Sequence, residues 1–253
     1  MRKFCNLDFK NKIQVVDAKA LYDQVHGDMI KSMPSLFSFQ KRHLKSFEFV
    51  NNHLQISNNS VIAEIGPGHV LAMMRRAYSC EAVAFGIITE TIKKAFTGFG
   101  IKCVAYDANI EDFSLDWYGK FDCVLHLEVL EHLNRWPVEV LRDTAKLLKP
   151  DGKLILSTPN FTRLSNRVRM LIGKSPLINP FIKTDGGLNH VREYTMQEIL
   201  ELCEHSGLYS EASEYWQYRL LGAKVALLPL ITAVPSLSSH MFFCLSKSVL
   251  KET

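Results

Sequence analysis

The amino-acid sequence predicts an α/β protein with an open, doubly wound and mostly parallel sheet that carries helices on both faces. Two observations lead to this fold class. From residue 61 onward, short apolar runs alternate with helical patterns. The first of these runs is followed at once by a glycine-containing turn at residues 66–68, which opens a helix. Strand and helix alternating in this way form βαβ units, whose strands are parallel.

The composition is that of one large globular domain or two small ones. The chain has 253 residues, of which 47% are hydrophobic and 22% are charged, so disorder, collagen and coiled coil are excluded. A net charge of +4 is too small by itself to indicate a nucleic-acid partner. Six scattered cysteines without a C-x-x-C pair indicate free thiols rather than a zinc knuckle. With no apolar leader pattern at residues 1–10, we expect a cytoplasmic protein.

An N-terminal helical segment, residues 1–56, precedes the main domain, which we assign to residues 57–253. Its helical character follows from apolar residues spaced by four, as at Leu21, Val25 and Met29. An asparagine pair at residues 58 and 59 then predicts a turn.

The alternating region yields a complete series of elements. The predicted strands cover residues 61–65, 82–87, 102–106, 121–126 and 153–157, and the predicted helices cover residues 70–78, 90–97 and 137–148. Glycines end the second helix, and a proline begins the third. Farther on, Thr195 and Glu198 form a capping box that opens another helix. Two last strands are expected near residues 211–215 and 240–245.

Periodicity is lost after the fifth strand, and we expect a lid insertion over about residues 159–190. Residues 152–184 contain no acidic side chain but several basic ones, and apolar residues are interleaved with the arginines. This pattern fits a lid that recognises an anionic acceptor, an amphipathic segment on an anionic membrane surface, or a solvated loop. The apolar residues 220–237 fit packing against the sheet, an acceptor pocket or a dimer face.

The first strand ends in the motif Glu64-Ile-Gly66-Pro-Gly68. Glycines at this position let a ligand approach the backbone closely. A dinucleotide fingerprint would need another glycine at position 71, which is Leu71, so a nicotinamide cofactor is not indicated.

Several later motifs keep the same order as those of a known family. Asp107 follows the third strand, Asp122 opens the fourth, and the segments at residues 127–133 and 147–154 read LEVLEHL and LLKPDGKL. Together with the glycine motif they resemble the class I S-adenosylmethionine-dependent methyltransferases over about residues 45–246. The resemblance implies a Rossmann-like sheet of seven strands with the last strand antiparallel. It also places S-adenosylmethionine over the carboxyl ends of the first strands.

The resemblance assigns roles to particular residues. Glu64, Gly66 and Gly68 match the positions that hold the methionine moiety. The residues expected around the adenine and beside the sulfonium are Asp107, which meets the adenine amine, Asn109, Ile110, His126 and Glu128.

Two positions depart from the family pattern. Val70 stands where the family usually has a third glycine, and Ile88 stands where it usually has the acid that binds the ribose hydroxyls. Glu90 is acidic but lies two positions later. Loss of a charged ribose acceptor costs about 1.5–3 kcal/mol. Three consequences remain open: weak cofactor affinity, a substitute residue, or a non-catalytic fold that serves as a scaffold or regulatory subunit.

A divalent metal site is also suggested by the sequence. Glu128, Glu131 and His132 stand at i, i+3 and i+4, which share a face on a helix, and His190 offers a fourth ligand. Two carboxylates and imidazole suit Mg²⁺, Mn²⁺ or Zn²⁺. The pattern is similar to those of the ubiquinone-pathway O-methyltransferases and the small-RNA 2′-O-methyltransferases. Alternatively, Glu131 and His132 cap the next helix, and His132 or His190 is a general base.

Together these features predict a methyltransferase that moves a methyl group onto a hydroxyl oxygen by SN2 displacement. The expected acceptor is a small molecule, a sugar, a glycolipid or a quinone precursor, with contact to a membrane surface as a further expectation. The alternatives are the non-catalytic scaffold and an RNA ribose 2′-O-methyltransferase. RNA is disfavoured because few aromatic residues accompany the basic stretch.

Overall fold

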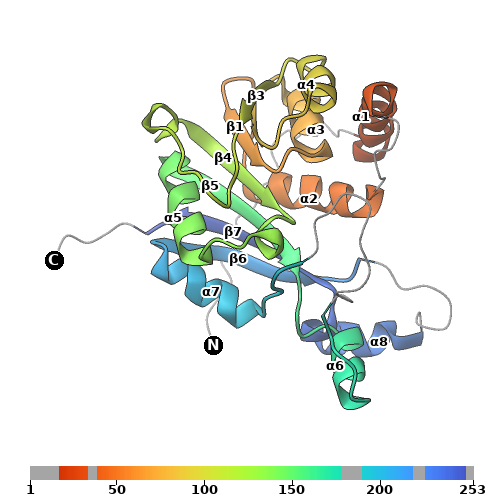
Figure 1. Cartoon of the computed structure of the whole chain (residues 1–253). Coiled ribbons are helices and arrows are strands. Elements are labelled where there is room, and N and C mark those ends of the chain that lie inside the picture. Colours follow the sequence, from red (N-terminus) through yellow and green to blue (C-terminus); the bar gives the residue numbers. More distant parts are fainter. Residues whose placement is uncertain (1–16, 34–38, 178–189, 219–225, 249–253) are drawn as a thin grey trace.

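The computed structural model describes residues 17–33, 39–177, 190–218 and 226–248 (Figure 1). A single seven-stranded sheet lies at its centre, with the strand order β3-β2-β1-β4-β5-β7-β6. The strands are β1 (Val61–Ile65), β2 (Glu81–Gly86), β3 (Lys102–Ala105), β4 (Phe121–Leu127), β5 (Leu148–Pro159), β6 (Leu208–Trp216) and β7 (His240–Lys247).

Strand β7 gives the sheet its mixed character. Strands β1 to β5 pair in parallel, whereas β7 lies between β5 and β6 and runs antiparallel to both. Its pairing with β5 extends to His240 opposite Pro159. The predicted doubly wound sheet of seven strands with an antiparallel last strand is therefore confirmed. Strand β5 is longer than predicted at both ends, because Leu148 pairs with Phe121 of β4 at its start and β7 continues to pair with it up to Pro159 at its end.

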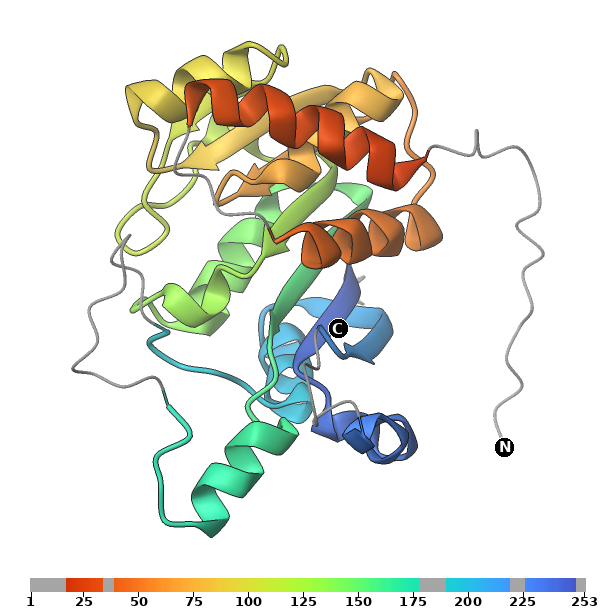
Figure 2. The same cartoon turned by 90° about the vertical axis from the view of Figure 1, so that its right-hand side faces the viewer.

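Helices cover both faces of the sheet (Figures 1 and 2). One face carries α1 (Ala18–Ser32), α2 (Gln40–His53), α3 (His69–Tyr78) and α4 (Glu90–Thr97), and the other carries α5 (Pro137–Leu147) and α7 (Met196–His205). The capping box predicted at Thr195 and Glu198 is present and begins α7. None of the helices in the described ranges combines the length and the apolar character needed to cross a membrane.

The two N-terminal helices belong to the core of the sheet. Helix α1 turns one stripe inward, formed by Leu21, Tyr22, Val25 and Met29, as the spacing of four predicted. Val25 and Phe49 of α2 pack in the same cluster as Ile62 of β1. The division of the chain after residue 56 stays a prediction, and the packing joins both sides of it in one core.

Aromatic and imidazole rings from α1, α2 and α3 stack where these helices meet. The ring of His69, the first residue of α3, lies 4.4 Å from the ring of His43 and 5.3 Å from that of Tyr22, centre to centre. Nε2 of His69 is 3.0 Å from Nδ1 of His26. The stack therefore connects both N-terminal helices to the helix that follows the glycine loop.

The insertion contains an element that the sequence did not predict, helix α6 (Leu164–Leu171). Its apolar residues Leu164, Val168 and Leu171 are spaced by four and three, but of its residues only Asn166 is buried, so the stripe does not pack into the core. The remaining short elements are η1 (Leu115–Trp117), η2 (Leu130–His132), α8 (Leu228–Ala233) and η4 (Pro235–Leu237). Residues 178–189 of the predicted lid lie outside the described ranges.

Candidate active site

The carboxyl ends of β1, β4 and β5 bring the predicted site residues to one edge of the sheet. Glu64 lies near the end of β1, Glu128 directly follows β4, and Thr158 lies near the end of β5. These three strands are neighbours in the order β1-β4-β5. In open α/β sheets this edge is where ligands bind.

Glu64 organises the glycine loop from beneath. Its side chain is buried, and Oε2 accepts hydrogen bonds from the backbone N–H groups of Gly68 at 2.9 Å and Leu71 at 3.3 Å. Burial raises the pKa of Glu64 to about 7, against the lowering effect of these two bonds. The carboxyl group therefore fixes the start of α3. Its effect on a ligand would be indirect, because it positions the glycine loop that would bind the ligand.

The loop is pressed between neighbouring strands. Gly66 has φ +75, and a Cβ atom there would stand 2.7 Å from Cγ2 of Val129. A Cβ atom on Gly86, the last residue of β2, would stand 2.7 Å from Cδ of Pro67. Glycine is therefore required at both positions by close approach, and at position 66 also by the left-handed backbone.

The two departures from the family pattern differ in their structural consequences. Val70 is 1% exposed and belongs to the core cluster beneath the N-terminal helices. Ile88 is half-buried after the end of β2, and Glu90 is exposed in the first turn of α4. The valine thus occupies core space, while position 88 offers no acceptor for a ribose hydroxyl.

Asp107 begins a self-bonded turn after β3. Its Oδ1 accepts from the N–H of Asn109 at 2.9 Å, and its own N–H donates to Oε2 of Glu111 at 3.0 Å. Oδ1 of Asn109 accepts from the N–H of Asn134 at 2.7 Å. Ile110 is 78% exposed at the same turn. The turn is fixed from both sides and presents an uncovered apolar side chain.

Glu128 is held as an anion by three partners. The residue has φ +57, and its Oε1 accepts from the Ser157 hydroxyl at 2.8 Å. Oε2 lies 3.3 Å from Nη1 of Arg42 and 3.4 Å from Nε2 of His240. Burial alone would raise the pKa of Glu128, but His240, Arg42 and Ser157 together bring it down to about 2.

Glu131 has the opposite character. It is 1% exposed; Oε2 accepts from the Thr158 hydroxyl at 3.1 Å, and Oε1 has no hydrogen-bond partner among the described residues. Burial, followed by the negative charge of Glu128, raises the pKa of Glu131 well above its usual range. Burial and the neighbouring charge thus favour the protonated form of Glu131, whereas the partners of Glu128 favour its ionised form.

Three of the four predicted metal ligands come together, and Glu128 does not join them. One ligand atom each from Glu131, His132 and His190 lies within 4.8 Å of the others. The expectation that Glu128 shares a helix face with Glu131 is wrong, because residues 130–132 form a single 3₁₀ turn preceded by a left-handed residue.

The alternative capping role of Glu131 and His132 is also wrong. The next helix, α5, begins at Pro137, its N-cap is Trp136, and no side chain caps it. The backbone carbonyl of Glu131 instead accepts from the N–H of Val191 at 2.6 Å and from that of Arg192 at 3.2 Å. These bonds bring the segment after the insertion against the turn.

His190 is oriented by a buried ion pair. Its Nδ1 lies 2.8 Å from Oε1 of Glu193, and the same carboxylate pairs with Arg163, whose Nη2 is 3.0 Å from Oε1. Burial raises the pKa of Glu193, but the bonds from His190 and Arg163 outweigh it and lower the pKa overall. The ring of His190 lies 4.9 Å from that of His132, edge to face.

His126 lies deeper than the rest of the site. It is fully buried in β4 between Ile65 and Leu156, and its ring nitrogens have no hydrogen-bond partner in the part of the chain that the structure describes. Burial lowers the pKa of His126 to about 4, so the imidazole is neutral.

Some contributors to the site carry no sequence signal. Arg42 of α2 and His240 of β7 reach Glu128 from elements far apart in the chain. Their approach depends on helix packing and on the position of β7 next to β5, which local patterns do not reveal. Glu193 was within reach of sequence reasoning, because it stands three residues after His190, in the same segment.

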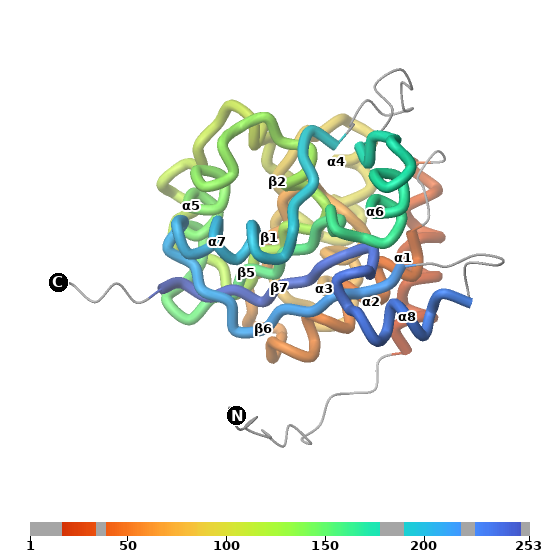
Figure 3. Tube along the Cα trace, turned by 90° about the horizontal axis from the view of Figure 1, so that it is seen from below, coloured from red at the N-terminus to blue at the C-terminus, as the bar shows by residue number. Residues whose placement is uncertain are grey.

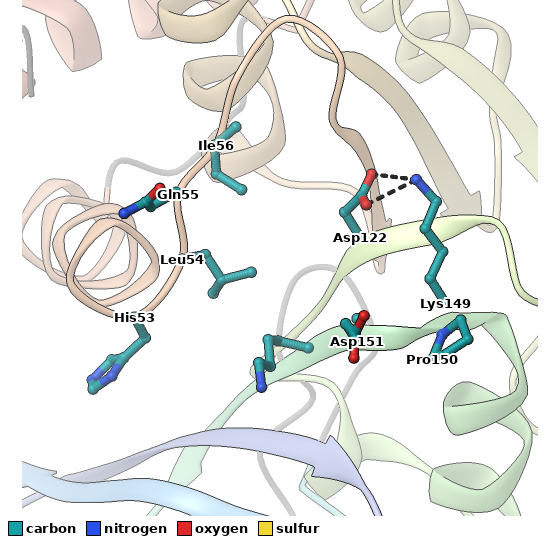
Figure 4. A pocket seen from close by; sticks show the side chains of 10 residues that line it. His53, Leu54, Gln55, Ile56, Asp122, Lys149, Pro150 and Asp151 are labelled. Carbon is teal, nitrogen blue, oxygen red and sulfur yellow. Dashed lines mark hydrogen bonds and ion pairs between the residues drawn. The ribbon is translucent and has the colours of Figure 1, made fainter.

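A cavity of about 420 Å³ lies at the opposite edge of the sheet (Figure 4). Asp122 at the amino end of β4 accepts two bonds of 2.8 Å from Lys149 there, and also one of 2.7 Å from the N–H of Val61. Lys153 pairs with Glu211. Both lysines are thus paired with carboxylates of the protein, and the cavity is separate from the site.

Comparison with known protein families and curated sequences places this geometry in context. A family model described as a methyltransferase domain matches residues 63–212. The ubiquinone biosynthesis O-methyltransferase of Xanthomonas euvesicatoria pv. vesicatoria (strain 85-10) is 30% identical over 118 residues, which cover 46% of this chain and 49% of the relative. The enzyme of the same name from Chromobacterium violaceum is 25% identical over 168 residues, 64% of this chain and 69% of that one. The chain thus spans about half the length of the first of these relatives.

Solved structures share the fold at low identity. An S-adenosylmethionine-dependent methyltransferase from Mesorhizobium loti superposes with a TM-score of 0.54 at 13% identity, covering 78% of this chain and 95% of that one. The Burkholderia thailandensis 1,6-didemethyltoxoflavin-N1-methyltransferase, solved with S-adenosylhomocysteine, gives a TM-score of 0.54 at 14% identity, covering 91% and 87%. At these identities the likeness concerns the fold.

Proposed function

Because the chain belongs to the class I S-adenosylmethionine-dependent methyltransferases, as its motifs predicted, we propose that it transfers a methyl group from S-adenosylmethionine to a hydroxyl oxygen. The observation that carries the proposal is the meeting of two features at one sheet edge. The Glu64-supported glycine loop follows β1, and the cluster of Glu131, His132 and His190 follows β4 and the insertion. One feature would hold the methyl donor, and the other would prepare the acceptor.

The residues at this edge fit the cofactor. The loop at residues 66–68 leaves no room for side chains on Gly66, and Ile87 and Ile110 expose 66% and 78% of their surface beside the ends of β2 and β3. An adenosyl group would cover such apolar side chains. Asp107 and Asn109 would hold the adenine end, and the Glu64 loop would hold the methionine end. S-adenosylmethionine supplies an activated methyl group on its sulfonium.

His190 is the residue best placed to take the proton from the acceptor. When the imidazole is neutral, its bond to Glu193 keeps the proton on Nδ1 and leaves the Nε2 lone pair available. The acceptor hydroxyl gives its proton to Nε2 while its oxygen forms the bond to the methyl carbon. The carbon–sulfur bond breaks, and its electron pair stays on sulfur. Ionised Glu193 stabilises the imidazolium that results.

A divalent ion fits the same cluster. Oε1 of Glu131 is buried without a hydrogen-bond partner among the described residues, and one ligand atom from each of Glu131, His132 and His190 lies within reach of a shared ion. These three residues would hold Mg²⁺, Mn²⁺ or Zn²⁺. Such an ion lowers the pKa of a bound hydroxyl and orients it. We propose the metal as an alternative to the His190 route, because Nε2 of His190 cannot be a metal ligand and a base at the same time.

The proposed acceptor is a small molecule, a sugar, a glycolipid or a quinone precursor. The curated relatives carry the name ubiquinone biosynthesis O-methyltransferase, which supports an oxygen acceptor. RNA ribose is less well supported, because Arg163 is bound to Glu193, and Arg167 to Ser236 and the carbonyl of Thr162. A non-catalytic scaffold is less well supported too, since the side chain of Val70 packs into the core and not into the glycine loop at residues 66–68.

We also propose a reducing compartment, in keeping with the expected cytoplasmic location. All five cysteines in the described ranges carry free thiols. Burial raises the pKa of Cys80 and Cys244 to about 11 and that of Cys203 to about 12, so these thiols are protonated and unreactive.

Cofactor binding is the first test. Titration calorimetry with S-adenosylhomocysteine should show micromolar binding that weakens on Asp107→Ala. Asp116→Ala, at an exposed aspartate of η1, serves as the matched control and should leave the affinity unchanged. Absence of binding at millimolar ligand would overturn the enzyme proposal and favour the scaffold.

Methyl transfer is the second test. The protein is incubated with methyl-labelled S-adenosylmethionine and a catechol, with and without Mn²⁺, and label in the product is measured. His190→Asn should lower the rate by a factor of about 100 or more. His205→Asn, at an exposed histidine at the end of α7, is the control. Transfer that survives His190→Asn at full rate would contradict the assigned base.

A further inference from the structure

Helices α6 and α8 project together beyond the carboxyl edge of the sheet. Helix α6 follows the end of β5 at Pro159, and α8 with η4 precedes β7, whose first residue, His240, pairs with Pro159. Both helices therefore leave the sheet at the same place. Figures 1 and 2 show them at the lower end of the molecule, and Figure 3, seen from below, shows them on the same side.

Polar contacts at their base join α6 and the residues before it to the segment around η4, which directly follows α8. Nδ2 of Asn160 donates to the carbonyls of Ser236 and Ser238, both at 2.8 Å. Nη2 of Arg167 lies 3.1 Å from the Ser236 hydroxyl, and the Thr162 hydroxyl donates to the Ser236 carbonyl at 3.2 Å. The projecting surface is therefore a fixed part of the fold rather than a pair of separate loops.

The outer side of this base is strongly apolar. On the α6 side, Leu171 is 85% exposed and Ile172 is 61% exposed. On the other side, Ile231 of α8 and Leu237 of η4 are buried. The other exposed apolar side chains of the surface are Val168, Met170, Leu177, Leu227, Leu228, Leu230 and Val234. An exposed aliphatic patch of this extent is typical of a surface that another phase or molecule covers.

The charges of the surface are all positive. Arg169 is exposed within α6 and Lys174 follows it, whereas Arg163 and Arg167 are engaged at the base. Residues 160–177 and 226–239 contain no aspartate or glutamate. Free positive charge thus stands beside exposed leucines, a combination typical of segments that lie on anionic lipid.

We propose that this two-helix surface, formed by the exposed side chains of residues 164–177 and 226–235, binds anionic lipid bilayers. The leucines and Ile172 would enter the boundary of the acyl chains, and Arg169 and Lys174 would meet lipid phosphates. A second copy of the chain fits less well, because a twofold contact would bring uncompensated positive charges together. RNA fits less well because the exposed residues are aliphatic and offer no ring for bases to stack on.

The proposal does not depend on methyl transfer, and the test needs no cofactor. The full chain is sedimented with vesicles of phosphatidylcholine alone and with vesicles of equal parts phosphatidylcholine and phosphatidylglycerol. We expect binding to the anionic vesicles that exceeds binding to the neutral ones at least about fivefold per basic residue engaged. Added salt should weaken it.

Substitutions on exposed positions test the surface without disturbing the core. Leu171→Asp and Leu228→Asp should each lower vesicle binding about tenfold or more, and Arg169→Glu should lower the preference for anionic vesicles. Leu115→Asp removes a leucine that is 78% exposed on η1, outside the surface, and Lys94→Glu reverses an exposed charge on α4. Both controls should bind vesicles like the original chain.

Two results would overturn the proposal. One is a chain that stays in solution with both kinds of vesicle. The other is vesicle binding that Leu171→Asp and Leu228→Asp leave unchanged while light scattering shows that they separate a dimer into monomers. The second result would assign the surface to contact between copies of the chain.

Discussion

The half-buried imidazole of His190 and the buried carboxylate of Glu193 form a dyad, with Nδ1 2.8 Å from Oε1. Arg163 contacts the same carboxylate from α6's start, so the orientation of His190 depends on the folded insertion. The dyad resembles the arrangement by which carboxylates set the tautomer of catalytic histidines. It makes Glu193 a positioning residue for the proposed base.

Replacing the carboxylate should therefore slow methyl transfer through His190. We expect Glu193→Gln to lower kcat at least about tenfold with little change in the KM for S-adenosylmethionine. The double variant Glu193→Gln with His190→Asn should be no slower than His190→Asn alone. Additive losses, or a loss of folded protein in thermal melts, would show that Glu193 acts only through stability.

Metal binding at the cluster should release a proton. Glu131 has a pKa raised well above its usual range, first by burial and then by Glu128, so a proton competes with an ion for this carboxyl group. Calorimetric titration with Mn²⁺ or Zn²⁺ in two buffers of different ionisation enthalpy measures this release. Glu131→Gln should abolish binding, and Glu139→Gln, on exposed α5 surface, should not. Absence of binding at millimolar ion would exclude the metal and leave the His190 route.

Gly66 should tolerate no side chain unless Val129 is made smaller. Gly66→Ala and Gly119→Ala both place alanine at positive φ, +75 and +67, but only the first brings Cβ within 2.7 Å of another side chain. We expect Gly119→Ala to cost about 1 kcal/mol and Gly66→Ala to cost a further 1–3 kcal/mol or so. Val129→Ala should recover most of that difference. Urea denaturation of Gly66→Ala, Gly119→Ala, Val129→Ala and the double variant Gly66→Ala with Val129→Ala measures these costs. Equal costs for the two glycine substitutions would refute the close contact.

Glu64 should make the fold less stable as the pH rises. Its pKa is about 7 in the folded protein against 4.5 for the free group, mainly through burial. The folded state therefore holds the extra proton between pH 4.5 and 7, and stability falls through that window by about 3 kcal/mol. Glu64→Gln should gain that amount relative to the original chain on going from pH 5 to pH 8. An equal pH dependence of both proteins would contradict the assignment.

His69 should act in the opposite direction. Burial and the charge of His26 lower the pKa of His69 from 6.5 to about 4. Between pH 6.5 and 4, His69 is therefore protonated in the unfolded chain but not in the folded one. The free energy of unfolding falls as the pH falls through this range. His69→Asn should lessen this loss by about 3 kcal/mol. The exposed His205 provides the control variant, whose pH dependence of unfolding should match the original.

Most of the fold was predictable because local patterns determine it. The predicted strand at residues 61–65 and the helix at residues 90–97 have the observed bounds, since polar and glycine boundaries flank clear apolar patterns. Helix α6 was missed because it is only eight residues long, and Leu164, Val168 and Leu171 are too few to reveal its helical spacing among the irregular residues around it. The strand predicted to end at residue 157 continues to Pro159 in the structure. Its last residues pair with β7, which lies far away in the sequence, so local patterns did not reveal them.

The site was predictable in composition but not in geometry. Glu131, His132 and His190 lie together as the motif predicted, whereas Glu128 turns toward α2 and β7 because of its left-handed backbone. A non-glycine residue in that conformation gives no sequence signal. The roles of Asp107, Asn109 and Ile88 toward the cofactor stay predictions that the binding experiments address.

The place of β7 in the sheet has a consequence for the order in which the protein matures on the ribosome. Strand β6 emerges before β7, yet among the described strands it pairs only with β7. It therefore has no partner strand while residues 217–239 are synthesised. His240, which helps to hold Glu128 ionised, arrives with that last strand. A nascent chain that stops before His240 therefore has the glycine loop, but its Glu128 lacks the imidazole partner from β7. The site is therefore completed only when β7 has taken its place between β5 and β6.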